Sequence, residues 1–278
     1  LEAIFNNLLR ESTTKIAVQS LALKCLKQYQ YKWLNPYMEH LDGIVKDKDS
    51  GMRDRLIALN IIRGDTSVIK EDHRAKMLPL LFGILCAKMM LRKVKGKGKS
   101  NPKQRRGTIL RYVANSDTSE FNSFLDILVA PFKESINFAS GAPSANAVVP
   151  LTKQLGFLNL VLDLTANLGE ALANFLPRII TIVVRMIYDA EGLLLVRDSL
   201  KPQFAAMLKS VRLMGTKRLV GLTKVHTDFD FKPFQPALYT GVVERPLSML
   251  ASESVQSPSA VLTLFEAWSE EPDLHYLL

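Results

Sequence analysis

The sequence predicts an all-α protein, an α-solenoid built from HEAT-like helical repeats. Apolar residues recur at steps of three and four along most of the chain, which is the period of one helix face. No comparable run alternates apolar and polar residues with the period of two that a half-buried strand requires. The chain has 278 residues and is 47% hydrophobic, which suffices for a packed core in one elongated array or in two modules.

Five segments show the helical period clearly. The first contains Val18, Leu21, Ala22, Cys25 and Tyr29 on one face. The same spacing recurs within 78–89, 121–132, 157–168 and 261–268. Short polar turns between such segments indicate antiparallel helix pairs, which bury a shared face only when neighbouring pairs stack. The stretch 14–46 fits one pair, with helices at about 15–26 and 36–46, although no strict sequence period repeats.

Two polar stretches interrupt the helical pattern. Residues 95–102 contain three lysines, two glycines and one proline, and no apolar side chain, so we expect them to be disordered. Residues 139–150 are rich in Ala, Ser, Pro and Gly and are predicted to be a linker. We therefore expect front repeats at 1–138, with a basic insert at about 92–106, and rear repeats at 151–278. Because both ends are apolar, we also expect the chain to be a fragment of a larger solenoid.

The composition argues against a secreted or membrane protein. Cys25 and Cys86 are too few for a disulfide scaffold, and each lies among apolar residues at helical spacing. No signal peptide opens the chain. The longest apolar stretch, 171–187, is interrupted by Pro177, Arg178 and Arg185, and it is shorter than the ~20 residues that a membrane span needs. The sequence predicts a soluble intracellular protein with no membrane partner.

No combination of residues predicts catalysis. The histidines lie far apart, at His40, His73, His226 and His275, and no Cys-x-x-Cys or His-x-x-x-His pair occurs. Gly98-Lys99-Ser100 is similar to the end of a phosphate-binding loop, but the position that requires the first glycine is Lys93. No Gly-x-Ser-x-Gly motif is present either. We expect a protein that is not an enzyme and has no metal, no cofactor and no small-molecule substrate.

The strongest feature is a basic segment at residues 92–106. Its eight basic residues, with no acidic one among them, are the candidate nucleic-acid-binding residues: Arg92, Lys93, Lys95, Lys97, Lys99, Lys103, Arg105 and Arg106. The net charge of the chain is +9, so the rest of the chain carries only +1. Such a segment suits phosphate neutralisation. It has no aromatic residue for base stacking, so it would bind the nucleic-acid backbone without reading sequence.

Three other interpretations of this segment stay open. It could be a nuclear or nucleolar targeting signal, a binding site for an acidic protein partner, or a solvated loop. A second, weaker basic group comprises Lys209, Arg212, Lys217, Arg218 and Lys224. There we expect a solvated helix end, with Gly215 breaking the helix.

Short strings in a fixed order resemble the down-regulated-in-metastasis domain. This domain belongs to the giant HEAT-repeat component of the small-subunit processome, in the small nucleolar RNA-associated protein twenty family. The strings include Ser20–Leu26, Asn35-Pro36-Tyr37, Arg53-Asp54, Glu71-Asp72-His73-Arg74, Leu78-Pro79, Arg105-Arg106, Leu176-Pro177, Ser257-Pro258 and Trp268-Ser269. Together they cover nearly the whole chain. One departure is Cys86-Ala87-Lys88, where the family pattern has an aromatic residue, a glycine and a basic residue.

The resemblance implies a nucleolar scaffold that acts in early small-subunit assembly and supports cleavage and folding of pre-ribosomal RNA. It implies no catalytic residues. The implied partners are pre-ribosomal RNA, the small nucleolar RNA–protein particle and other small-subunit assembly factors, in the nucleus and nucleolus. The residues alone leave open a second class, a HEAT-repeat adaptor or transport module that binds protein partners.

Overall fold

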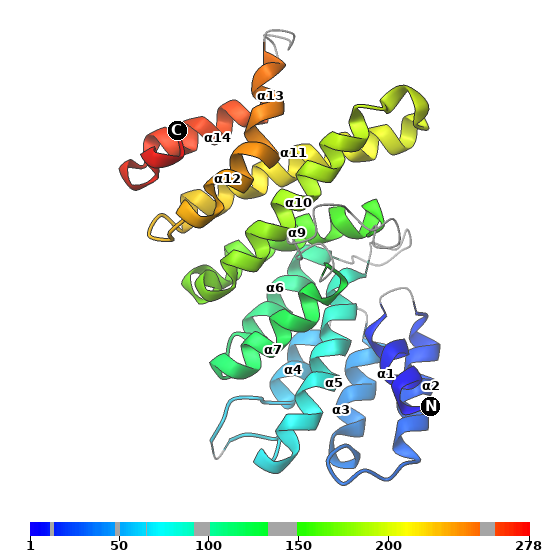
Figure 1. The fold of residues 1–278 in the computed structure, drawn as a ribbon. Helices are drawn as coiled ribbons and strands as arrows, with labels where there is room; N and C mark the ends of the chain where they lie inside the picture. The colour runs from blue at the N-terminus through cyan, green and yellow to red at the C-terminus, as the bar shows by residue number, and fades with distance from the viewer. Residues whose placement is uncertain (12–13, 48–50, 65, 92–100, 133–148, 251–258) are drawn as a thin grey trace. The chain divides into compact units, whose positions relative to one another are not determined.

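The computed structural model describes residues 1–11, 14–47, 51–64, 66–91, 101–132, 149–250 and 259–278. Every regular element in these ranges is a helix (Figure 1), and the prediction of an all-α protein of helical repeats is confirmed. The helices form two compact units, Leu1–Ala130 and Pro131–Leu278. Most of the predicted linker at 139–150 lies outside the described residues, so the division at that linker stays a prediction.

Seven α-helices of the front unit are described; the first four pack each against the next, and further along the chain the fourth packs against the sixth and the fifth against the sixth and seventh. They are α1 (Glu2–Arg10), α2 (Ile16–Lys27), α3 (Met38–Lys46), α4 (Met52–Ala58), α5 (Glu71–Met90), α6 (Pro102–Val113) and α7 (Thr118–Val129). A 3-10 turn, Asn35–Tyr37, leads into α3, and α2 packs against α3 as the helix pair expected at 14–46. A second 3-10 turn, Ala130–Phe132, follows α7.

Helix α5 is the centre of the front unit. Its residues are apolar on almost every side, which is typical of a helix buried all round. It packs against α1, α3, α6 and α7, and the rings of Phe82 and Phe124 meet edge to face with centroids 5.6 Å apart. The Cys86 thiol is buried here, and desolvation raises its pKa, so it is a packing residue and not a nucleophile.

The rear unit is organised around one long helix, α11 (Pro202–Val225), which packs against α9 (Leu151–Leu168), α10 (Leu176–Leu194) and α14 (Ala260–Glu270). Figure 1 shows α10 and α11 as an antiparallel hairpin. A 3-10 segment, Gly169–Phe175, connects α9 to α10. Two short helices, α12 (Gln235–Leu238) and α13 (Glu244–Ser248), flank the π-helical turn Tyr239–Val243, and the 3-10 segment Pro272–Leu277 follows α14.

The prediction that Gly215 breaks a helix is wrong. Helix α11 runs through Gly215 without interruption, and Gly215 is buried where α11 crosses α10. A β-carbon added there would lie 2.5 Å from Cγ1 of Ile187 on α10. The glycine therefore allows two helix backbones to approach closely, and packing against α10 compensates for its poor helix propensity.

One described stretch, Leu151–Leu194, is long and apolar enough to cross a membrane by length and composition alone. In the structure it consists of α9 and α10, which are separated by the 3-10 segment Gly169–Phe175. The residues of its most apolar window are 56% buried inside the rear unit. Both helices of this stretch pack against α11 and belong to the core of the rear unit.

Candidate nucleic-acid interface

The eight basic residues predicted to bind nucleic acid fall into two sets. Arg92, Lys93, Lys95, Lys97 and Lys99 lie outside the described residues. Lys103, Arg105 and Arg106 lie in the first turns of α6. This helix begins where the sequence favours a start, because the Asn101 side chain accepts a hydrogen bond from the Gln104 backbone N–H at 3.3 Å and Pro102 follows Asn101.

Arg105 has a structural role. It is only 5% exposed, and its Nη2 donates a hydrogen bond to the carbonyl oxygen of Leu91 at 2.7 Å. Leu91 is the residue directly after α5, so its carbonyl has no partner within the helix and the bond satisfies it. Arg105 thereby ties the end of α5 to the start of α6. Its charge is directed into the protein, whereas Lys103 is exposed and Arg106 is half-buried.

Part of the string at 71–74 forms a buried ion pair. The Arg74 guanidinium, whose side chain is 3% exposed, binds the Glu120 carboxylate of α7 through two bonds, Nε–Oε1 at 2.7 Å and Nη2–Oε2 at 2.6 Å. Nη2 also donates to the carbonyl oxygen of Ile61 at 2.8 Å. Burial by itself raises the pKa of Glu120, but the hydrogen bonds and charge of Arg74, with the charge of Arg63, outweigh burial and lower that pKa.

Two further polar contacts hold the front unit together. The Tyr37 hydroxyl lies 3.0 Å from Nδ1 of His73 and accepts a bond from the Lys70 backbone N–H at 3.0 Å. Lys88, the basic residue of the divergent 86–88 step, is buried, and its Nζ donates to the carbonyl oxygens of Val45 and Asp47 at 2.6 and 2.8 Å. A cation at the C-terminal end of α3 is also favoured by the helix dipole.

The weaker basic group on α11 is mostly engaged in contacts within the rear unit. Arg212 pairs with Glu191 at 3.2 Å, Arg218 Nε donates to the carbonyl oxygen of Leu158 at 2.7 Å, and Lys224 pairs with Glu270 at 2.8 Å. The remaining members, Lys209 and Lys217, are exposed. This group therefore stabilises the fold more than it presents a basic surface.

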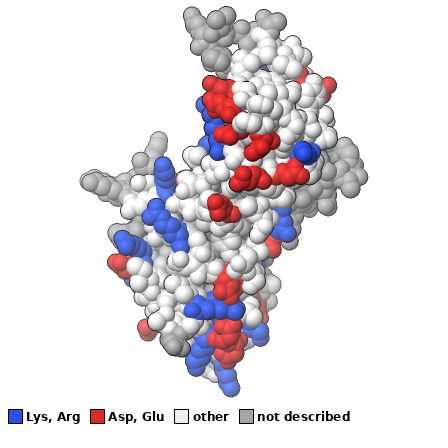
Figure 2. All heavy atoms as spheres, turned by 90° about the vertical axis from the view of Figure 1, so that its left-hand side faces the viewer, with Lys and Arg blue, Asp and Glu red and all other residues white. Residues whose placement is uncertain are grey.

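The two units differ in the charge of the surface seen in Figure 2. On that view most of the side chains that gather on the rear unit are acidic, whereas the front unit shows basic side chains along its left edge and a mixture of basic and acidic ones at its lower end. The exposed acidic residues in the loop after α11, on α14 and just after α14 are Asp228, Asp230, Glu266, Glu270 and Asp273. A polyanion is repelled by such a surface, so the charge favours the front unit for nucleic-acid contact.

Within the residues that the structure describes, no group of three or more His, Cys, Asp or Glu side chains could hold a metal ion. The polar contacts above join helix to helix, and the candidate interface is a basic segment beside α6. These features define a helical-repeat protein in which the basic segment at 92–106 is the candidate site for a polyanion.

Comparison with known proteins then gives the family. The whole chain, residues 1–278, matches the family described as U3 small nucleolar RNA-associated protein 20, N-terminal, and the chain belongs to it. The resemblance drawn from the short strings is thereby confirmed.

Two curated relatives are both named U3 small nucleolar RNA-associated protein 20. The Schizosaccharomyces pombe protein is 26% identical over 259 residues, which is 91% of this chain and 10% of that protein. The Saccharomyces cerevisiae protein is 24% identical over 268 residues, or 94% of this chain and 10% of that protein. The chain thus spans about a tenth of the length of these relatives.

Proposed function

We propose that this chain is a non-catalytic scaffold segment of a nucleolar small-subunit processome component, acting in pre-ribosomal RNA processing and small ribosomal subunit assembly. The family match over the whole chain carries this proposal. The printed name of both relatives associates them with U3 small nucleolar RNA. The partners would be pre-ribosomal RNA, the small nucleolar RNA–protein particle and other assembly factors.

The helical body would act by its shape. Its buried charged side chains, such as Arg74, Lys88 and Arg105, hold helices to one another and to the loops between them. Side chains engaged in this way fix the spacing of helices, which a scaffold needs, and they leave little for chemistry. This supports a structural role for the described part of both units.

RNA contact would be made by the basic segment. Seven of its eight residues remain candidates for phosphate contact: Arg92, Lys93, Lys95, Lys97, Lys99, Lys103 and Arg106. Arg105 is excluded from this set because it is buried against Leu91. The bond between Arg105 and Leu91 would keep both ends of the segment at one place on the front unit, so that the segment binds RNA where α5 ends and α6 begins.

The test is the salt dependence of RNA binding by the whole chain. The probe is an RNA duplex of about 20 base pairs, long enough for contacts across successive grooves. The test variant carries glutamine at the seven candidate positions and keeps Arg105. A control variant carries glutamine at seven exposed lysines elsewhere: Lys15, Lys24, Lys27, Lys32, Lys153, Lys209 and Lys217.

Both variants lower the net charge by the same amount, so they separate a local site from general attraction. We expect the test variant to bind RNA more weakly and to flatten the plot of log K against log salt, by about 0.9 for each duplex phosphate that the protein no longer neutralises. The control variant should keep most of the slope. Equal decreases in affinity for the two variants, or no decrease for the test variant, would contradict RNA binding by the segment and favour the protein-binding adaptor.

A further inference from the structure

Three aromatic rings form a column on the front unit. They lie on the connection from α2 to the 3-10 turn before α3, at the lower end of the front unit in Figure 1. The rings of Tyr29 and Tyr31 stack with centroids 5.5 Å apart and an interplanar angle of 5°, and those of Tyr31 and Trp33 stack at 5.5 Å and 19°. Because the rings of Tyr29 and Trp33 do not contact each other, Tyr31 is the middle of the column and the other two rings are its ends.

The segment that carries the column is ordered. Leu26 and Leu34, on either side of it, are 2% and 0% exposed and anchor it in the core. Gln30, between the two tyrosines, has a φ of 51°, a left-handed conformation that is unfavourable for a residue with a β-carbon. Its backbone N–H donates to the Lys27 carbonyl at 3.0 Å, and that of Leu34 donates to the Tyr31 carbonyl at 3.0 Å. A residue keeps such a conformation when its surroundings fix it, and conformations of this kind cluster at ligand sites.

Tyr29 is the open end of the column. Tyr31 covers one face of its ring, yet 42% of Tyr29 is exposed. A ring that is covered on one face and still exposes this much surface presents its other face to solvent. Among the residues that the structure describes, Tyr31 is the one ring in contact with Tyr29, and no Lys or Arg lies over the Tyr29 ring.

The segment around the column is basic in composition. Residues 14–38 contain four lysines and no acidic residue. Two of these lysines, Lys27 and Lys32, lie within two residues of a ring in the chain, so their Cα atoms are at most about 7 Å from that of a ring residue. Both are exposed, and neither makes an ion pair with a described residue. The acid at the column, Glu2, accepts a hydrogen bond from the Tyr31 hydroxyl at 2.8 Å. The charge of the segment therefore favours an anionic ligand.

We propose that the column of Tyr29, Tyr31 and Trp33 is a stacking platform for an unpaired base of single-stranded RNA. The base extends the column on the open face of Tyr29, and the lysines of the segment attract the phosphates beside it. Because every base has a flat face, the platform binds RNA without reading its sequence. The proposed function gains a second RNA contact that has its own residues and does not rest on the basic segment at 92–106.

A base fits the column better than a proline-rich peptide does. Such peptides dock in grooves lined by aromatic side chains. Here the rings close on one another with centroids 5.5 Å apart, so the column offers a flat end and no slot between its rings. Stacking of a base requires only such an end. The Tyr29 ring is already held by Tyr31, so its ordering costs little when a base binds.

The experiment measures binding of a labelled oligouridine of about 10 nucleotides to the whole chain by fluorescence anisotropy. It is done in the native chain and in the variant with glutamine at the seven candidate positions of the basic segment, which removes the other RNA contact. In both, Tyr29→Leu should weaken binding at least about fivefold, the lower end for loss of one stacked base. Tyr29→Phe keeps the ring and should bind as the parent does.

Two further probes separate stacking from attraction by charge. An abasic strand of the same length keeps the phosphates and has no bases, and an RNA duplex of about 20 base pairs offers no unpaired base. Neither should distinguish Tyr29→Leu from its parent. Because the duplex tests the basic segment and the unpaired strand tests the column, either contact can fail without the other.

The matched control is Tyr239→Leu. Tyr239 is 52% exposed on the rear unit and stacks on no ring among the described residues, so its replacement should leave oligouridine binding unchanged. The proposal is overturned if Tyr29→Leu binds oligouridine as its parent does, or no more weakly than Tyr239→Leu or Tyr29→Phe. An equal loss for the abasic strand or the duplex would also overturn it. So would a decaproline peptide whose binding depends on Tyr29 while that of oligouridine does not.

Discussion

Replacing Glu120 by glutamine should destabilise the front unit strongly, because it leaves the Arg74 guanidinium buried without its carboxylate. Removing one partner of a buried ion pair costs about 3–5 kcal/mol. Arg74 keeps its bond to the Ile61 carbonyl, and the Glu120 side chain is 11% exposed, so we expect the lower end, about 3 kcal/mol. With a urea m value of roughly 1.5 kcal/mol per molar, the unfolding midpoint should fall by about 2 M.

The two tryptophans allow the units to be followed separately. Trp33 lies in the front unit and Trp268 in the rear unit. In a Trp268→Phe background, tryptophan fluorescence during urea unfolding therefore reports on the front unit alone. The measurement compares Glu120→Gln with the parent in this background.

The control for this prediction is Glu71→Gln. Glu71 is also close to Arg74, with Oε2 3.9 Å from Nε, but its side chain is 69% exposed. A solvated pair of this kind contributes about 0–1 kcal/mol, so its removal should move the midpoint little. If Glu120→Gln shifts the midpoint no more than Glu71→Gln does, the account of the buried pair as the main polar link between α5 and α7 is refuted.

Three further predictions concern other buried positions. In thermal melts, Gly215→Ala should destabilise the rear unit by about 1–3 kcal/mol through overpacking. Gly221→Ala, on the same helix but with open space around it, should stabilise the rear unit by about 0.5–1 kcal/mol. His226 is buried, and desolvation lowers its pKa, so on acidification the unfolded state takes up a proton before the folded state does. The stability of the rear unit should therefore fall as pH drops below the ordinary histidine pKa of about 6.5. In urea titrations from about pH 7 to 5, His226→Leu should remove this dependence of stability on pH, and an unchanged dependence would assign it to another group. Arg105→Met should cost the front unit about 1–3 kcal/mol and Lys103→Met less than about 0.5; equal effects would show that Arg105 is not the tie between α5 and α6.

The helical architecture could be predicted from the sequence because the apolar period is local. The face Val18–Tyr29 predicted a helix near 15–26, and α2 spans Ile16–Lys27. The prediction that Gly215 breaks the helix was wrong for a non-local reason. Helix propensity describes an isolated helix, whereas Gly215 is fixed by the approach of Ile187 from α10, which no local pattern reveals.

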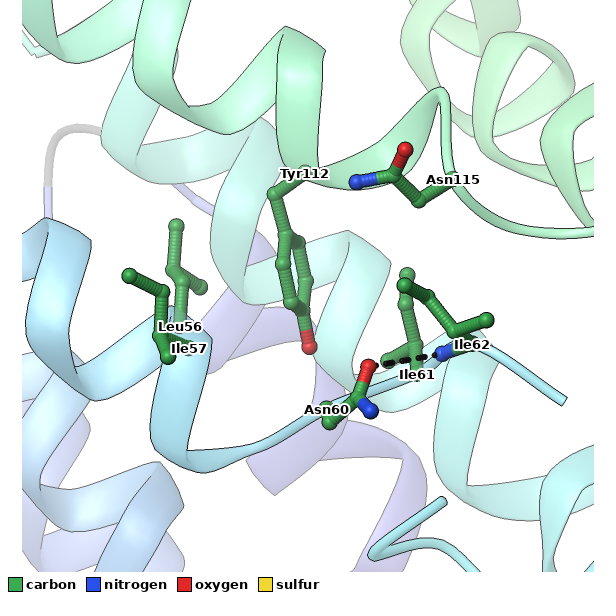
Figure 3. A pocket seen from close by; sticks show the side chains of 7 residues that line it. All are labelled: Leu56, Ile57, Asn60, Ile61, Ile62, Tyr112 and Asn115. Atoms are coloured by element: carbon green, nitrogen blue, oxygen red, sulfur yellow. Dashed lines mark hydrogen bonds between the residues drawn. The ribbon is translucent and has the colours of Figure 1, made fainter. Parts of the chain in front are cut away.

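The candidate site was predictable in composition and not in the role of each residue. Charge density marks residues 92–106 as a polyanion site, but Arg105 and Arg106 are indistinguishable in such a count. Burial separates them, because the turn of α6 that exposes Lys103 directs Arg105 toward Leu91. The hollow lined by Ile57 and Tyr112 on the front unit (Figure 3) could not be predicted from the sequence. Its walls are about 55 residues apart in the chain and meet only when α4 packs against α6.

The most direct test of the central claim is to map protein–RNA crosslinks on the full-length protein within assembled small-subunit precursors. The account predicts crosslinks within residues 92–106, at Lys103 or Arg106 and not at Arg105, with few on the acidic end of the rear unit. Crosslinks confined to α11, at Lys209 and Lys217, or an absence of crosslinks between residues 92 and 106, would contradict it.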